Sequence, residues 1–277
     1  MLQTIGTTFH TIFVTPIINV LVMLYDVLTS VGIPGALGFA IITITVAIRF
    51  LMHPLFQKQM KTAQVMKDLK PQLDALQKKY KKDPKKLQAE QLKLYQVAGI
   101  NPASGCLFAI IQMPIIFGLY QALNQFFNTN GYSAKIQEIN KQLYFPNFQI
   151  ENLNTLFIGF DLAKSPAQAG LWFYYLIPIM TAGLQYWQSK VTMSANPMTD
   201  LSAIKDDKEN KEKDKDGKKE GSTSDEFQKA MNTQMKYFFP IMIGYFSYTL
   251  PIGLSIYWNA FSLFSIIQHY ITHKNKK

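Results

Sequence analysis

One cation stands inside a long apolar run and is the first candidate for chemistry in this chain. Arg49 lies near the end of Val31–Met52 and is the only arginine, the other 27 basic residues being lysines. A run of this length is about enough to cross a hydrocarbon layer of ~30 Å. A charge inside such a run costs about 2.5–3.5 kcal/mol on insertion scales, so it is a functional candidate. Because Met52 is close, Arg49 can also be a boundary residue whose side chain reaches the interface.

Polar groups on other apolar segments could share a site with this arginine. Thr45 lies one helical turn before Arg49 on the same face, Gln112 lies in the second apolar segment, and Tyr257 and Trp258 lie in the last. The chain has five long apolar segments, and none contains an acidic residue. They are Val31–Met52, Gly105–Phe127, Leu171–Ser189, Tyr237–Leu250 and Ile252–Ile271. The arginine therefore needs water, a carbonyl or a ligand, and a shared wet cavity is the economical solution. The expected chemistry is binding of a polar or acidic group by a fixed positive charge.

The composition is that of a polytopic membrane protein. The chain has 277 residues, is 48% hydrophobic and carries a net charge of +10. Its lysines fall between or after long apolar segments, which fits contact with anionic lipid or ribosomal RNA. The single cysteine, Cys106, excludes an internal disulfide. No nucleophile motif, metal-ligand cluster or phosphate loop stands out, so we expect no enzyme, no cofactor and no metal.

The apolar and polar segments predict an all-α fold with five transmembrane helices. In chain order we expect an interfacial helix at 1–30, a first span at 31–53, a cytoplasmic helical hairpin at 54–104, a second span at 105–127, an extracellular loop at 128–170, a third span at 171–189, a cytoplasmic loop at 190–236, a fourth span at 237–250, a fifth span at 252–272 and a basic tail at 273–277. The insert at 198–226 is highly charged and is predicted to be disordered and exposed.

The N-terminal segment Phe9–Leu28 is apolar with helical spacing. Pro16 interrupts its middle and Asp26 lies on its polar side, so an interfacial helix is favoured over a sixth span. The residues before Ala36 include no Lys or Arg, so no basic signal-peptide region opens the chain, and a removed lipoprotein leader would leave no trace here. The predicted apolar face comprises Phe9, Ile12, Phe13, Ile17, Val20, Leu21, Leu24 and Leu28.

The segment His53–Gly99 reads as an antiparallel helical hairpin with 11 lysines and 4 acidic residues. It is a solvated hairpin whose lysines fix orientation, a docking arm for a ribosome, a targeting factor or a lipid surface, or both at once. Its two narrow apolar stripes are Met66, Leu69, Leu73, Leu76 and Tyr80, and then Leu87, Leu94 and Val97.

In the third span, an aromatic belt is predicted from Trp172, Tyr174, Tyr175, Tyr186 and Trp187.

Lysine counts orient the five spans. The hairpin, the loop at 190–236 and the tail hold 24 lysines, whereas the opposite side holds 3. The first group is therefore cytoplasmic, the N-terminus lies outside and the C-terminus inside. Arg49 then lies on the cytoplasmic side of the first span.

Several strings resemble the YidC/Oxa/Alb family of membrane protein insertases in its five-span Gram-positive form. The proline two residues after Gln112, taken with Arg49 at the end of the first span, is a specific combination. The matching strings are Thr43–Pro54, Asn101–Leu123, Gly159–Leu162, Phe239–Ile241 and Leu250–Gln268.

The resemblance implies a hydrophilic groove that is open to the cytoplasm and closed outside. Arg49, Thr45, Gln112, Tyr257 and Trp258 take the positions of its groove residues. The implied partners are nascent membrane proteins, the Sec translocon, and the ribosome or signal recognition particle pathway through the hairpin. The implied location is the bacterial cell membrane. Ile252 and Ser262 depart from the family pattern, which usually has alanine and asparagine there.

Two other functions compete with insertion. A small-solute transporter or channel with a cationic cavity would also explain Arg49, although no intramembrane acidic chain and no inverted repeat support it. A scaffold that anchors ribosomes through its lysines would explain the hairpin.

Overall fold

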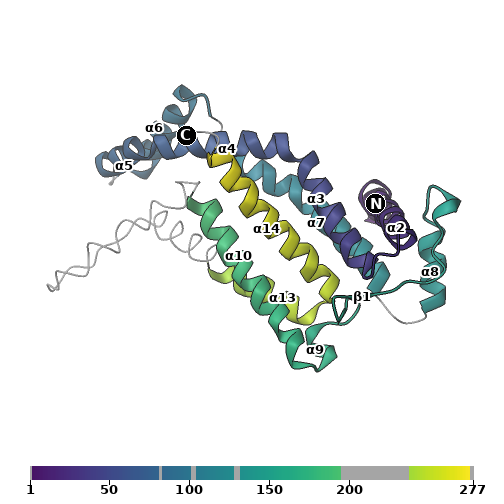
Figure 1. Ribbon diagram of the computed structural model, residues 1–277. Helices are drawn as coiled ribbons and strands as arrows, with labels where there is room; N and C mark the ends of the chain where they lie inside the picture. Colours follow the sequence, from purple (N-terminus) through teal and green to yellow (C-terminus); the bar gives the residue numbers. More distant parts are fainter. Residues whose placement is uncertain (1, 81–82, 101–103, 128–131, 195–236, 275–277) are drawn as a thin grey trace.

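A computed structural model describes residues 2–80, 83–100, 104–127, 132–194 and 237–274, which form a mostly helical chain (Figure 1). The charged insert at 198–226, the rest of the predicted loop from 195 to 236 and the last tail residues 275–277 lie outside these ranges.

The N-terminal segment is one continuous helical stretch with a widened turn in its middle. It runs through α1 (Leu2–Phe9), the π-helical turn η1 (His10–Val14) and α2 (Thr15–Ser30). Pro16 follows the widened turn directly, and a proline that cannot donate a backbone hydrogen bond is a common cause of such irregularity.

The predicted apolar face of this helix is partly wrong. Ile12 and Val20 are 58% and 39% exposed, whereas the buried positions are Val14, Ile18, Leu21, Val22 and Tyr25. The helix is apolar around much of its circumference, so periodicity alone could not select the face. Its contacts with α3 (Ala36–Leu51) and with α7 (Ser104–Phe127) select it instead.

Among the described residues, one helical stretch, Gly6–Ser30, is long and apolar enough to cross a membrane. A second candidate is the bent pair α3 (Ala36–Leu51) and α4 (His53–Asp68), whose axes differ by 56°. The expectation that the N-terminal helix lies in the interface stays a prediction.

The helix that carries Arg49 begins and ends at identifiable signals. Gly35 precedes α3 with φ 76°, a left-handed conformation that glycine adopts without strain. At the other end, Met52 caps α3, and Pro54 stands in the first turn of α4, where its missing N–H is tolerated. The bend at Met52 therefore separates an apolar helix from a lysine-rich one.

The polar segment after the bend contains three helices rather than a simple hairpin. Pro71 lies in the first turn of α5 (Lys70–Lys79), and the preceding helix α4 ends at Asp68. α5 packs against α6 (Pro84–Val97), whereas α4 packs along α7. The second predicted apolar stripe is wrong at Val97, which is 88% exposed, and Tyr95 is buried instead.

The last helix of the chain is central to the bundle. α14 (Ile252–Lys274) lies between α3 on one side and α10 (Leu176–Ser194) on the other (Figure 1). α13 (Phe239–Thr249) packs on α10 and has only 11 residues, which is about 16 Å of helix. Each face of α14 therefore meets a different helix.

The polar segment 132–170 has secondary structure of its own, so the fold is not purely helical. It contains α8 (Tyr132–Asn140), the 3₁₀ turn η2 (Pro146–Phe148), a two-stranded antiparallel sheet of β1 (Leu156–Phe157) and β2 (Phe160–Asp161), and α9 (Pro166–Ala169). The two-residue turn Ile158–Gly159 has φ 48° and 82°, the positive pair that a tight hairpin turn requires.

This segment closes one end of the bundle through backbone hydrogen bonds. The first amides of α14 are donors without helical acceptors. Ile252 N–H donates to the Lys164 carbonyl at 3.0 Å, and Gly253 N–H donates to the Leu162 carbonyl at 3.1 Å. The same segment also binds the N-terminal helix, because Asn19 Nδ2 donates to the Gln142 carbonyl at 3.0 Å.

The predicted aromatic belt is wrong at one position. Tyr174, in the 3₁₀ turn η3 (Trp172–Tyr175), is 4% exposed, and its hydroxyl accepts a hydrogen bond from Asp161 N–H at 2.9 Å. The other four aromatic residues of that prediction are exposed. Tyr174 is buried because the hairpin β1–β2 folds over it, a contact that the local sequence does not reveal.

Candidate functional site

Arg49 is buried in the last turn of α3 and is held by a single residue of α14. Its side chain is 4% exposed. Nη2 donates a hydrogen bond to the Phe261 carbonyl at 3.3 Å, and the guanidinium carbon lies 3.5 Å from the centroid of the Phe261 ring. The arginine thus has a carbonyl and a π face as partners, as expected for a buried cation that lacks an acid.

No carboxylate of the described residues forms a salt bridge with Arg49. Its Nε is buried and has no hydrogen-bond partner. A buried donor without a partner costs about 1–3 kcal/mol, and more when it is charged. Among the described residues, Arg49 Nε is therefore left as a donor that could still bind an acceptor.

Two further buried polar groups lie close to Arg49. Gln112 of α7 and Tyr257 of α14 are 6% and 3% exposed, and Gln112 Oε1 and Tyr257 Oη have no hydrogen-bond partner among the described residues. Tyr257 interacts electrostatically with Arg49 and faces the Gln112 amide. Three helices thus bring together one donor, one acceptor and one hydroxyl. We call Arg49, Gln112, Tyr257 and Phe261 the Arg49 cluster.

Thr45 and Trp258 take different places from the rest of the predicted site. Thr45 is 1% exposed on the buried side of α3, but its hydroxyl donates to the Ile41 carbonyl of its own helix at 2.6 Å. Trp258 is half-buried and packs against the apolar core. The ring that stacks on the guanidinium belongs to Phe261, which the sequence analysis missed. Its spacing of one turn from Tyr257 was the available signal.

The opposite face of α14 forms a second polar contact, with α10 and α13. The Ser262 hydroxyl donates to Gln185 Oε1 of α10 at 2.6 Å, and the Ser247 hydroxyl of α13 lies 2.7 Å from that of Ser255 and 3.2 Å from that of Thr181. Such hydrogen bonds hold apolar helices together. Gln185 was also missed, because single polar residues in an apolar helix do not reveal their partners.

Where α3 bends into α4, His53 links the bend to α14. Gln57 Nε2 lies 2.8 Å from His53 Nε2, and Gln268 Nε2 lies 2.5 Å from His53 Nδ1. Both contacting atoms are amide nitrogens, which donate, whereas a neutral imidazole accepts at one nitrogen only. One of the two amides must therefore present its oxygen to the ring N–H, an orientation that rotation of the amide provides. This contact and the stacking of Arg49 fix the end of α3 against α14.

The sequence of this chain is similar to that of known proteins. The family described as 60Kd inner membrane protein matches residues 27–277, a range that contains the whole Arg49 cluster. The chain belongs to this family. The resemblance to the YidC/Oxa/Alb insertases is thereby confirmed, and the five-span Gram-positive form stays a prediction.

Individual relatives in this family carry insertase or inner membrane protein names. The membrane protein insertase YidC of Alkalihalophilus pseudofirmus is 31% identical over 270 residues, which cover 94% of this chain and 80% of the relative. The chloroplast inner membrane protein ALBINO3 of Arabidopsis thaliana is 30% identical over 264 residues, with 92% and 50% covered. The YidC of Helicobacter pylori strain J99 is 28% identical over 246 residues, with 88% and 34% covered. The chain therefore spans half or less of two of these three relatives.

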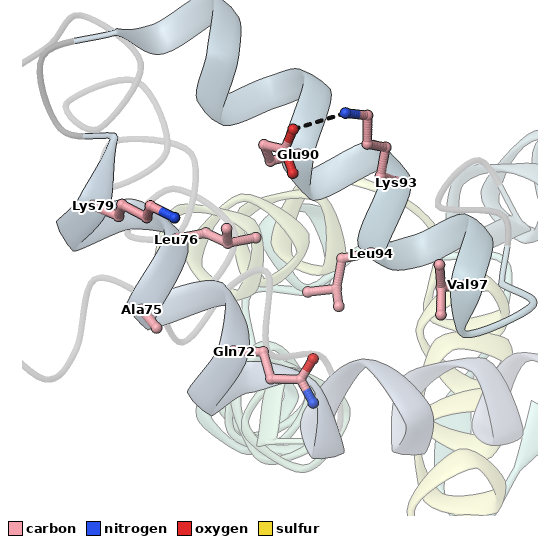
Figure 2. Close-up of a pocket in the computed structure, with 8 residues that line it drawn as sticks. All are labelled: Gln72, Ala75, Leu76, Lys79, Glu90, Lys93, Leu94 and Val97. Carbon is pink, nitrogen blue, oxygen red and sulfur yellow. Dashed lines mark hydrogen bonds and ion pairs between the residues drawn. The ribbon is translucent and has the colours of Figure 1, made fainter.

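The family member described here also carries a pocket far from the Arg49 cluster. It lies between α5 and α6, has a volume of about 380 Å³ and is open to one side (Figure 2). Figure 2 shows Leu76 and Leu94 pointing toward each other, with Glu90 and Lys93 joined at the rim. The remaining lining residues are Gln72, Ala75, Lys79 and Val97.

Among the described residues, no group of three or more His, Cys, Asp or Glu side chains could hold a metal ion.

Proposed function

We propose that this chain is a membrane protein insertase and folding chaperone that receives nascent membrane proteins at the Arg49 cluster. The observation that carries the proposal is a buried arginine that has no acidic partner among the described residues, accompanied by polar atoms of two other helices that lack hydrogen-bond partners in the same part of the chain. Such atoms are costly unless something fills the site during function. The proposed cargo is a membrane protein, because relatives in the YidC family are named membrane protein insertases.

The proposed topology has five spans around a groove that opens to the cytoplasm. α3, α7, α10, α13 and α14 would cross the bacterial plasma membrane, with the N-terminus outside and the C-terminus inside. The lysine asymmetry supports this orientation. The short α13 supports a locally thinned or wet bilayer, which would shorten the apolar path of the cargo.

In the proposed mechanism the cargo places its polar outer segment in the groove and releases its apolar segment into lipid. Arg49 attracts acidic or polar groups of that segment, because a cation in a site of low dielectric acts more strongly than in water. Gln112 and Tyr257 would replace part of the water that the segment loses. The apolar span would slide along α10 and α14. No covalent step is required, and insertion would proceed alone or with the Sec translocon.

The test is insertion of defined cargo by purified protein in liposomes. Arg49→Ala and Arg49→Glu should impair cargo with acidic outer segments, whereas Arg49→Lys should be tolerated because the charge remains. Photocrosslinkers at Thr45, Gln112 and Trp258 should capture a nascent membrane protein. Normal insertion of every cargo by both the alanine and the glutamate variant would overturn the role of Arg49.

The polar helices are proposed to recruit partners rather than to insert cargo. The hairpin α5–α6 contacts the bundle little beyond α4, and its lysines suit ribosomal RNA, a signal recognition particle or anionic lipid. Removal of the hairpin should reduce ribosome recruitment while the crosslinks near Arg49 persist. If those crosslinks also vanish while solute flux through the liposomes appears, the chain would be a small-solute transporter or channel rather than an insertase.

A further inference from the structure

The guanidinium of Arg49 is held on two sides by one residue. The Phe261 ring covers one face of the guanidinium, and the Phe261 carbonyl accepts from Nη2. The same ring lies 5.8 Å from the Tyr257 ring at an interplanar angle of 45°. A flexible arginine side chain is thereby restricted to one orientation by a residue that sits one turn beyond Tyr257 on α14.

This orientation decides which arginine donor remains free. With Nη2 bonded to a carbonyl and one face covered, Nε is a buried donor without a partner. The Tyr257 hydroxyl interacts electrostatically with Arg49 and has no hydrogen-bond partner among the described residues, and the Gln112 amide that it faces can offer either its oxygen or its nitrogen after rotation about its last bond. Arg49 Nε and the Tyr257 hydroxyl can thus each donate to a common acceptor.

We propose that Phe261 is a specificity-determining positioning residue, which fixes Arg49 so that Arg49 Nε and the Tyr257 hydroxyl bind one acidic side chain of the cargo. A carboxylate accepts up to four hydrogen bonds, and its charge matches a cation that has no acidic partner among the described residues. A carboxamide of the same shape offers one acceptor and no charge. The inference rests on the proposed insertase function and narrows its substrate class.

The alternative role for Phe261 is simple packing in the core, and a neighbouring residue provides the matched control. Phe264 lies three residues further along α14, and its ring centroid lies 5.3 Å from that of Phe50, whereas the described cation–π contact of Arg49 is with Phe261. Phe261→Leu and Phe264→Leu therefore remove the same number of apolar atoms from the same helix. Only the first removes the ring under the guanidinium.

The experiment compares two cargo proteins that differ only by Glu or Gln in the outer segment. Insertion into proteoliposomes is measured for both, and the Glu-to-Gln ratio is reported because it cancels differences in the amount of folded insertase. The wild type and Phe264→Leu should show the same preference for Glu. Phe261→Leu should lower the ratio by about 2- to 30-fold, the range of a lost cation–π contact, and Phe261→Tyr should restore it.

The outcomes separate this inference from the proposed function. If Arg49→Ala lowers the ratio but Phe261→Leu behaves like Phe264→Leu, Phe261 only packs and the inference is wrong. A ratio that rises in Phe261→Leu also overturns it, because the ring would then compete with the cargo. If Arg49→Ala leaves the ratio unchanged, the role of Arg49 in the proposed function fails first.

Discussion

The ring of Phe157, in β1, occupies the space that any side chain at Gly38 of α3 would need. A Cβ placed on Gly38 would lie 2.2 Å from Cδ2 of that ring. Phe157 is 8% exposed and also packs edge-on against Phe39 at 5.2 Å. The hairpin β1–β2 is thereby fitted onto the first turns of the helix that carries Arg49.

Gly38→Ala should destabilise the protein by about 1–3 kcal/mol, because a buried ring must move to admit the methyl group. The measurement is the midpoint of thermal unfolding of the purified protein in detergent. Gly183 of α10 is the matched control, since a Cβ there meets nothing within 4 Å. Gly183→Ala should be neutral or stabilising by up to about 1 kcal/mol. Equal midpoints for the two variants would show that Phe157 is not tightly packed on α3.

The turn that carries Phe157 contains a strained residue. Ile158 has φ 48° and is 75% exposed, so its side chain gains little packing in return. A β-branched residue in the left-handed region costs roughly 1–2 kcal/mol, whereas glycine and asparagine tolerate it. Ile158→Gly and Ile158→Asn should therefore raise the unfolding midpoint, and Ile158→Val should not. A gain with valine as large as with glycine would contradict strain as the cause.

These contacts mark the limit of what could be predicted from the sequence. Arg49 was identifiable because a lone cation in an apolar run is costly wherever it lies. Its need for water, a carbonyl or a ligand followed from the absence of acidic residues in the five apolar segments, and the structure places a carbonyl there. Phe261 had only its spacing of one turn from Tyr257 as a signal, which does not single it out, because an aromatic residue in an apolar helix looks the same whether it packs in the core or under a guanidinium.

Apolar periodicity also failed where helices are apolar on more than one side. In the N-terminal helix the buried face includes Val14 and Ile18 and leaves Ile12 exposed. In α6 the buried residue is Tyr95, and Val97 is exposed at the edge of the open pocket. In both cases the neighbouring helix decides the face, and the sequence of one helix does not say where its neighbour lies.

The hydrogen bond from Ser262 to Gln185 should contribute measurably to the contact between α14 and α10. Interhelical hydrogen bonds of this kind are worth about 0.6 kcal/mol on average and up to about 1.7. A double-mutant cycle with Ser262→Ala and Gln185→Ala isolates the pair, because each single change removes the same bond. Unfolding by denaturant in detergent gives the four stabilities. A coupling energy near zero would mean that the two side chains bond to water or lipid instead.

In the hairpin α5–α6, Glu90 and Lys93 form an exposed ion pair whose stabilisation depends on pH. Lys93 Nζ donates to Glu90 Oε1 at 2.8 Å, and this hydrogen bond and the lysine charge lower the pKa of Glu90 below 4.5. The same pair raises the pKa of Lys93 above 10.5. The stabilisation is therefore present at neutral pH, is lost as the pH falls through the lowered pKa of Glu90, and is lost again as the pH rises through that of Lys93.

The carboxyl carbon resonance of Glu90, followed by NMR in the full chain, should titrate below 4.5 in the wild type. Lys93→Met should bring the pKa of Glu90 back toward its ordinary value, because the hydrogen bond is its largest cause. Lys58→Met, in α4, removes the same charge elsewhere and should leave Glu90 unchanged. The protection of α6 amides, taken relative to their intrinsic exchange rate at each pH, should fall in acid for the wild type and show no such step in Lys93→Met. An identical titration of Glu90 in both lysine variants would mean that the pair does not form in solution.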